Sequence, residues 1–220
     1  MPEQSVCVIA GMGRGVSCAV ARRFGTAGFR VAMLARRADR LAEFERELQS
    51  AGVSARGYTV DLGMEAQVRG AFQKIEGEFG PAGVLIYNAS AGHPGRPTSL
   101  SERAMLADFR INAVSPLWCV QEVLDGMIGA GRGTIAFTGG GLALAPQTDF
   151  ASLSIGKAAV RSLAFTLAQE LEGTGIHVGT ITICGYVQEG THFSPERIAE
   201  EFWRLHCQPA GQFETEIVYR

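Results

Sequence analysis

The regular alternation of short apolar runs with helical segments constrains this chain more than any other feature. Apolar, β-branched runs predict strands at residues 5–10, 30–35, 54–60, 84–87, 133–138, 176–183 and 213–219. Helical patterns lie between them, at residues 15–27, 38–50, 64–78, 102–128, 151–172 and 195–206. The early strands are apolar on both faces, which is typical of strands covered by helices on both sides. The alternation therefore predicts an α/β protein, a single domain built on a doubly wound parallel sheet of about seven strands.

The size and composition of the chain narrow its function class. Its 220 residues suit one domain, and a net charge of −2 gives no basic surface for nucleic acid. No apolar run reaches the roughly 20 residues of a membrane span, and the N-terminus lacks the pattern of a signal peptide. The five cysteines are scattered without a CxxC pair, which argues against a metal site or a disulfide framework. We expect a cytoplasmic protein with a small-molecule ligand and no membrane or nucleic-acid partner.

The first predicted strand runs into a glycine-rich turn, AGMGRGVS, before the first helix. Ligands of doubly wound sheets bind beyond the carboxyl ends of the strands, where this turn lies. Gly11, Gly13 and Gly15 let the backbone approach a phosphate, and the helix that begins near Val16 favours an anion. The same glycines would also suit a tight turn that binds nothing.

The second predicted strand ends in LARRADRL and lacks the acidic residue that usually holds the ribose hydroxyls of NAD. Ala35 stands there instead, followed by Arg36 and Arg37. A guanidinium can bind a 2′-phosphate through two hydrogen bonds, and Arg14 in the glycine turn can reach the same group. The pattern predicts NADP(H) as the preferred cofactor and NAD(H) as the alternative, unless these arginines are only solvated.

Polar residues also follow the third and fourth predicted strands. Asp61, beside Leu62, can accept a hydrogen bond from an adenine amino group, or it can cap the next helix. Asn88 and Ala89 in YNAS leave room for a flat ligand, or the asparagine can close the strand with a local turn. We expect these four residues in the cofactor site.

In their order and spacing, these motifs resemble the short-chain dehydrogenase/reductase superfamily over residues 5 to about 187. AGMGRGVS is similar to the family's TGxxxGxG turn, YNAS to its NNAG motif, and CGYV at residues 184–187 to its PG motif. RINAVSP places Asn112 where the family has its active-site asparagine. The resemblance implies a Rossmann fold, an NAD(P) cofactor, and Val187 as a further cofactor contact.

The family's YxxxK motif is matched by LSIGK, with Lys157 as the lysine. Leu153 stands at the tyrosine position, and Gly140 stands at the position of the family's serine. In the family, the tyrosine donates a proton to the carbonyl oxygen, the serine hydrogen-bonds that oxygen, and the lysine holds the nicotinamide ribose. Leucine and glycine lack a hydroxyl, so only Asn112 and Lys157 remain of the usual four residues. The alternative for Lys157 is a solvated helix residue.

A replacement proton donor is expected near the same strand ends. Tyr186 is the best placed by sequence, and His93 and Thr138 are two further candidates. The segment near 188–195, which would cover a substrate, is shorter than is usual in the family. A short cap admits water more easily, so we expect an open cleft.

Two functions stay open on these observations. The first is an NADP(H)-dependent oxidoreductase that transfers hydride between the nicotinamide and a carbonyl or alcohol substrate, with an atypical proton donor or none. The second is a non-catalytic nucleotide-binding sensor or partner protein. The segment 151–172 lacks a broad polar face, with Arg161 and Gln169 as its main exceptions. The family pairs this helix with its symmetry mate, so we expect a homodimer or homotetramer.

Overall fold

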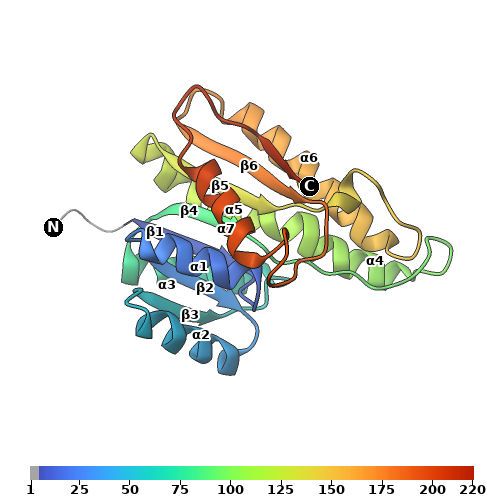
Figure 1. The fold of residues 1–220 in the computed structure, drawn as a ribbon, viewed down its shortest axis with the longest axis horizontal. Helices are drawn as coiled ribbons and strands as arrows, with labels where there is room; N and C mark the ends of the chain where they lie inside the picture. The colour runs from blue at the N-terminus through green and yellow to red at the C-terminus, as the bar shows by residue number, and fades with distance from the viewer. Residues whose placement is uncertain (1–4) are drawn as a thin grey trace.

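The computed structural model describes residues 5–220, which form a seven-stranded parallel sheet with helices on both faces (Figure 1). The strand order is β3-β2-β1-β4-β5-β6-β7. The strands are β1 (Val6–Ala10), β2 (Arg30–Ala35), β3 (Ala55–Thr59), β4 (Ala82–Tyr87), β5 (Gly133–Thr138), β6 (Ile176–Ile183) and β7 (Glu216–Tyr219). The helices are α1 (Val16–Thr26), α2 (Ala38–Ser50), α3 (Glu65–Phe79), α4 (Glu102–Phe109), α5 (Ser115–Ala130), α6 (Ala151–Glu170) and α7 (Pro195–His206). The predicted doubly wound sheet is confirmed.

The helices enclose two separate apolar cores, one on each face of the sheet. On one face, α1 and α7 pack against the sheet through Phe24 and Phe202, and α2 lies beside them. On the other face, α3 and α6 contribute Phe72 and Leu167. Strands β1 and β6 are buried along their whole length, as expected of strands covered by helices on both faces, and in β6 this includes the side chains of His177, Thr180 and Thr182. Across residues 5–220, no helix combines the length and apolar character needed to cross a membrane.

The predicted helix 102–128 is divided in the structure. α4 passes into a π-helical turn, Arg110–Val114, before α5 begins at Ser115. Turns of this kind are frequent at functional sites. Here the turn carries Asn112, whose buried side chain bonds to the backbone of Ala91. The apolar pattern of the sequence cannot reveal this turn, because the chain stays helical on both sides of it.

The end of the sheet also differs from the prediction. β7 begins at Glu216 rather than at residue 213, and Phe213 instead stacks on His177 of β6 with ring centroids 4.2 Å apart. A short 3₁₀ turn, Gly141–Ala143, follows the glycine run after β5 and has no counterpart in the prediction. Both differences lie in segments that connect elements, where side-chain packing decides the backbone path.

Candidate functional site

Three adjoining cavities lie along the edge of the sheet where the strands end. The first, about 610 Å³, is lined by residues that follow β1, β2, β3 and β4. The second, about 570 Å³, adjoins the ends of β1, β4, β5 and β6, and the third, about 550 Å³, lies between β5, β6 and α6. The strand order places β1 between β2 and β4, and a crevice at such a switch point is where doubly wound sheets bind ligands. Every residue predicted to contact the cofactor lines the first or the second cavity.

The glycine turn after β1 lines the first two cavities. Gly11 and Gly15 have φ angles of 97° and 96°, a region that glycine adopts without steric cost. A Cβ at Gly11 would overlap the backbone of Ala89 after β4, so the glycine also lets two strand ends meet. The Gly13 N–H donates to Ser17 Oγ at 2.9 Å, which ties the turn to the start of α1. The N–H groups of Gly11 and Met12 both donate to the Leu34 backbone oxygen, which also fixes the shape of the turn. The start of α1 at Val16 directly follows the turn, and a helix N-terminus favours an anion.

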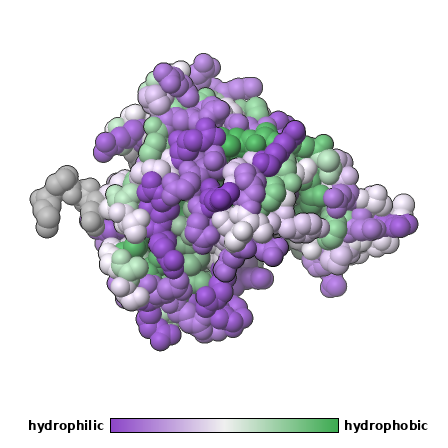
Figure 2. All heavy atoms as spheres, viewed as in Figure 1, coloured by the Kyte–Doolittle hydropathy of each residue, from purple (hydrophilic) through white to green (hydrophobic). Residues whose placement is uncertain are grey.

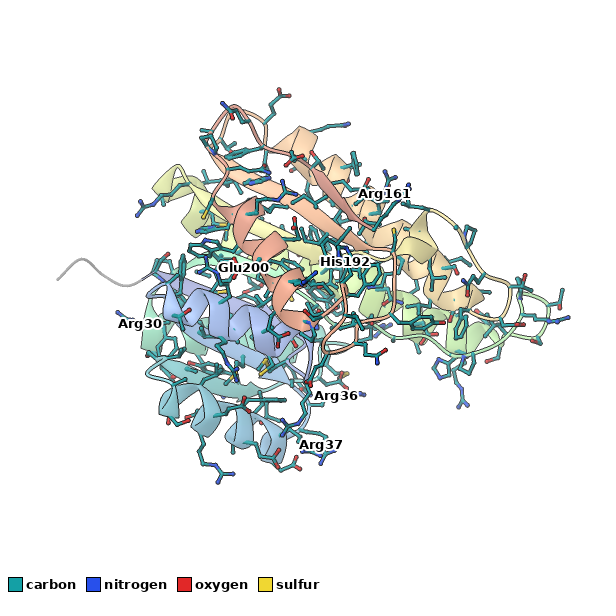
Figure 3. The ribbon with its side chains drawn as sticks, viewed as in Figure 1. Arg30, Arg36, Arg37, Arg161, His192 and Glu200 are labelled. Carbon is teal, nitrogen blue, oxygen red and sulfur yellow. The ribbon has the colours of Figure 1, made fainter. Side chains whose placement is uncertain are left out.

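The arginines of the first cavity differ in what they contact. Arg37 makes two hydrogen bonds to Asp39, at 3.2 and 2.6 Å, and Arg14 lies 3.5 Å from Glu43. Arg36 makes no ion pair or side-chain hydrogen bond with any other described residue. Arg36 and Arg37 project from the same edge of the molecule beside α2 (Figure 3). The guanidinium of Arg36 is therefore the one most free to bind an anion.

Arg40 is a residue of the first cavity that the sequence interpretation missed. It lies in the first turn of α2 and pairs with Glu43 at 2.8 Å. The sequence LARRADRL could have indicated Arg40, because α2 begins directly after β2 and its first turn therefore lies beside the end of that strand.

Asp61 and Leu62 line the first cavity after β3, as predicted. Asp61 Oδ1 accepts a hydrogen bond from the Gly63 N–H at 2.9 Å. The N-cap position of α3 is Met64, so the alternative that Asp61 caps this helix is wrong. The aspartate closes a local turn and keeps its place on the cavity wall.

Asn88 connects three strand ends. Its Nδ2 donates to the Gly11 backbone oxygen at 3.1 Å, and its Oδ1 accepts from Thr138 Oγ1 at 2.8 Å. These bonds join the end of β4 to those of β1 and β5, around the boundary of the first two cavities. Asn88 therefore shapes the site, and the alternative of a purely local turn does not describe its contacts.

Lys157 lies where the second and third cavities meet. Its Nζ donates to the Thr138 backbone oxygen at 2.8 Å, which fixes the ammonium at the end of β5. The residue as a whole is half-buried, but burial of its amine lowers the pKa from 10.5 to about 8. Val16 and Val187 complete the second cavity. The alternative of a solvated surface lysine is wrong.

Leu153 and Gly140 line the third cavity together with Lys157. Leu153 precedes Lys157 by one turn of α6, and residues at i and i+4 are neighbours on a helix. A Cβ at Gly140 would lie 3.5 Å from the Lys157 side chain, an ordinary contact distance. Most other side chains on the wall are apolar, including Leu142, Leu144, Phe150 and Ile183.

Asn112 does not line any of these three cavities, contrary to the catalytic role predicted for it. Its Oδ1 accepts from the Ala91 N–H at 3.0 Å, and its Nδ2 donates to the Ala91 oxygen at 2.7 Å. With both polar groups used by the backbone, Asn112 holds the π-helical turn against the loop after β4. The catalytic role of Asn112 stays a prediction.

The three predicted proton donors lie in different surroundings. Tyr186 lines the third cavity, but it is 90% exposed, so water surrounds its hydroxyl. Thr138 donates its hydroxyl proton to Asn88. His93 lies outside the three cavities and bonds through Nδ1 to Asp108 Oδ1 at 2.8 Å. None of the three combines a place in the third cavity with shelter from solvent.

Asp108 of α4 is a buried carboxylate that the sequence did not single out. Its Oδ2 accepts from the His93 N–H and from Ser152 Oγ, each at 2.6 Å. Burial by itself raises the pKa of Asp108, but the hydrogen bonds from Ser152 and His93 outweigh it, so the pKa lies below its usual value. The carboxylate joins the loop after β4 to the first turn of α6, next to Leu153.

Substitution Asp108→Ala is expected to lower the free energy of unfolding by about 2–4 kcal/mol, because the buried Ser152 hydroxyl and the His93 backbone and ring N–H groups lose their acceptor. The folded-state pKa is depressed, so this contribution is present above the unfolded value of about 4 and is lost as pH falls through the folded value. Urea unfolding at pH 7 and pH 3 measures both effects. The exposed Asp149→Ala serves as the control and should change stability by less than about 0.5 kcal/mol. Equal losses for the two variants would contradict the prediction.

Three features define this chain as a dinucleotide-binding α/β protein. They are the parallel sheet, the glycine turn after β1 and the arginines that follow β2. The profile described as short chain dehydrogenase matches residues 5–200. The chain therefore belongs to the short-chain dehydrogenase family, as the resemblance of its motifs indicated.

Individual relatives agree with this assignment. The 2,3-dihydro-2,3-dihydroxybenzoate dehydrogenase of Bacillus subtilis is 26% identical over 180 residues, which cover 82% of this chain and 69% of that protein. A metagenomic short-chain oxidoreductase solved in complex with NADP has a TM-score of 0.90 and 26% identity, over 98% of this chain and 96% of its own. An alcohol dehydrogenase from the archaeon Thermococcus sibiricus, complexed with 5-hydroxy-NADP, has a TM-score of 0.86 and 25% identity, over 99% and 98%.

Proposed function

We propose that this protein is an NADP(H)-dependent oxidoreductase that acts on a small carbonyl or alcohol substrate. The observation that carries the proposal is Lys157, fixed at the junction of a cavity that adjoins the glycine turn and a cavity with mainly apolar walls. The names of the similar proteins support it, since all three are a dehydrogenase or an oxidoreductase. The test is to mix the protein with NADPH and a series of ketones and aldehydes and to follow the loss of NADPH absorbance.

The residues of the first two cavities suit a dinucleotide. The Gly-rich turn and the N-terminus of α1 would hold the pyrophosphate, Asp61 would face the adenine, and Lys157 would hold the nicotinamide ribose. A bound NADPH supplies the hydride. The free guanidinium of Arg36, with no acidic residue after β2, favours a cofactor that carries a 2′-phosphate.

The Arg36→Ala variant is expected to bind NADPH about 10- to 100-fold more weakly, because a charge-assisted contact contributes about 1.5–3 kcal/mol. NADH affinity should change little, so the preference for NADPH falls. Arg37→Ala is the matched control, since Arg37 is already paired with Asp39 and should lose less. Fluorescence titration of both variants with both cofactors measures this. Equal effects of the two substitutions, or tighter NADH binding by the native chain, would contradict the assignment.

A second candidate function is a nucleotide-binding sensor without turnover. It is favoured by Leu153 and Gly140, which bring no hydroxyl to the third cavity at what we infer are the family's tyrosine and serine positions. Tight NADPH binding with no oxidation across the substrate series would support this second function over the first.

We infer that the segment between β6 and α7 is a shortened substrate cap. Residues 184–194 contain no helix or strand, and Tyr186 and Val187 in this segment are exposed. A cap of this length covers the third cavity only partly, so we expect weak substrate binding and a broad substrate range.

We infer that the protein forms a homodimer or homotetramer through the layer of α4, α5 and α6. Five apolar side chains on these helices are at least 37% exposed, and four of them are proposed for the interface: Leu106, Phe109, Leu117 and Ile155. The fifth, Ile128, lies near the C-terminal end of α5. Figure 2 shows hydrophobic surface mainly on the half of the molecule that carries β6 and α6, while the α1 and α2 half is mostly hydrophilic. Arg161, the main polar exception on α6, is paired with Glu216 of its own chain at 2.6 Å.

Sedimentation at micromolar concentration is expected to show an oligomer for the native chain and a monomer for Ile155→Asp, because a carboxylate cannot be buried unpaired in an apolar contact. The control is Ile128→Asp, because Ile128 is exposed near the C-terminal end of α5 and lies outside the proposed interface, so this substitution should leave the oligomer intact. A native monomer would rule out the interface.

The five cysteines are free in the structure, and a cytoplasmic location stays a prediction.

A further inference from the structure

We propose that Lys157 is itself the proton donor of this enzyme, delivering an Nζ proton to the substrate oxygen directly or through one bridging water. The inference rests on the proposed oxidoreductase function and names the group that does the work of the absent tyrosine. It assigns Lys157 a second role beside its contact with the ribose.

Position singles out Lys157 among the titratable groups of the two cavities. It is the one such residue that lines both the second and the third cavity. Arg14 and Glu189 line only the second cavity. Cys184, Tyr186 and Arg220 line only the third.

The other groups of the third cavity are poorly suited to proton transfer at neutral pH. Arg220 keeps its proton under all ordinary conditions. Tyr186 is surrounded by solvent, and Cys184 directs its Sγ to the Thr182 backbone oxygen at 3.7 Å. Lys157, in contrast, lines the cavity, and its amine is fixed by a hydrogen bond to the Thr138 backbone oxygen.

The ammonium of Lys157 has hydrogens to spare for this task. It carries three N–H donors, and one of them is used by the Thr138 backbone oxygen at 2.8 Å. Leu153 and Gly140 place no competing acceptor beside it in the third cavity. One free N–H can therefore face the cofactor ribose while another faces the substrate oxygen.

Atoms and charges balance in the proposed step. The carbonyl carbon gains a hydride from NADPH as the C–O π bond opens, and the oxygen takes a proton from Lys157 Nζ. The products are an alcohol, NADP⁺ and a neutral amine, which water then protonates. The lowered pKa of Lys157, about 8, suits this cycle because a general acid works best near the working pH.

The sequence makes this inference unusually easy to test, because Lys74 and Lys157 are its only lysines. Lys157→Ala is expected to lower kcat by about 10²–10⁴-fold, and added alkylamines should restore activity in proportion to their concentration. Lys157→Arg keeps the positive charge but cannot release a proton, so it should bind NADPH and still lose activity. Exposed Lys74→Ala is the control and should match the native chain.

A second readout does not depend on turnover. Protein labelled with carbon-13 at the lysine ε positions gives two side-chain signals, assigned with Lys74→Arg. The Lys157 signal should titrate with a midpoint at about pH 8, and kcat for carbonyl reduction should fall with pH through the same midpoint. The other titratable groups nearby are Arg14 and Glu189 in the second cavity and Cys184, Tyr186 and Arg220 in the third. In Glu189→Gln and in Tyr186→Phe, the midpoint of kcat should still coincide with the midpoint of the Lys157 signal.

The outcomes separate this inference from the proposed function. Native turnover that survives Lys157→Arg, or a Lys157 signal whose midpoint is not lowered from 10.5, would overturn the proton role and leave the oxidoreductase function standing. A native chain that binds NADPH but oxidises none of it with any carbonyl would overturn the proposed function, and the proton role with it.

Discussion

The double substitution Leu153→Tyr with Gly140→Ser is expected to raise kcat for reduction of a small generic ketone by about 10²–10³-fold, because the serine adds a hydrogen-bond donor for the developing oxyanion that Lys157 alone does not supply. Lys157 and the apolar third cavity are already in place beside both positions. The new tyrosine would carry its phenol one helical turn from the Lys157 ammonium, and the new serine would add a hydrogen bond to the substrate oxygen.

The local structure has room for both side chains. Gly140 has an extended backbone, with φ −167° and ψ 149°, and a Cβ there meets the Lys157 side chain no closer than 3.5 Å. The Leu153 side chain already lines a cavity of about 550 Å³, so a longer ring can extend into it. A Cβ at Gly140 therefore needs no movement of the backbone.

The matched control is Leu153→Phe with Gly140→Ala, which adds similar volume without either hydroxyl. Stopped-flow and steady-state assays with NADPH compare the two double variants with the native chain. If the Phe/Ala variant gains as much as the Tyr/Ser variant, the effect is one of packing. A Tyr/Ser variant that folds and binds NADPH but gains nothing would show that the open cap limits the reaction, since positioning alone can be worth several kcal/mol.

The fold was predictable because several buried strands consist mainly of apolar residues. β1 is buried along its whole length and apolar at every position, which marks a strand inside a doubly wound sheet, and β6 is equally buried although it carries His177, Thr180 and Thr182. The helical break at Arg110–Val114 was not predictable, because the residues on both sides of it favour helix. It depends on contacts with Ala91, which lies in a distant part of the chain.

The residues that line the first two cavities were easier to predict than the orientation of the side chains around the third. Residues such as Gly11 and Arg36 follow strand ends, and parallel strands bring their ends to one edge of the sheet. The direction of a side chain is a different matter. Asn112 turns to the backbone, and Tyr186 turns to solvent, because local packing decides these orientations. The buried Asp108 had no signal at all in one sequence, since nothing in its neighbours indicates that His93 and Ser152 converge on it.

The glycine turn allows two causes of strain to be separated by alanine substitution. Gly13 lacks a positive φ, and a Cβ added there would meet no atom within 4 Å, so Gly13→Ala should change the free energy of unfolding by less than about 0.5 kcal/mol. Gly15 has a φ of 96° in open space, so Gly15→Ala should cost about 1–2 kcal/mol from the backbone alone. Gly11 has a φ of 97° and its Cβ would lie 2.6 Å from Ala89 Cα.

Gly11→Ala is therefore expected to cost about 2–5 kcal/mol, since backbone strain of about 1–2 kcal/mol adds to overpacking of about 1–3 kcal/mol. It should also weaken NADPH binding, because relief of the clash with Ala89 must move the turn or the end of β4 out of the first cavity. Urea unfolding of the three variants and NADPH titration of those that fold measure the two effects separately. The order Gly13, Gly15, Gly11 is the discriminating result. If Gly15→Ala costs as much as Gly11→Ala, the conformation of the turn alone sets the requirement for glycine, and the close approach of the two strand ends at Ala89 contributes nothing to it.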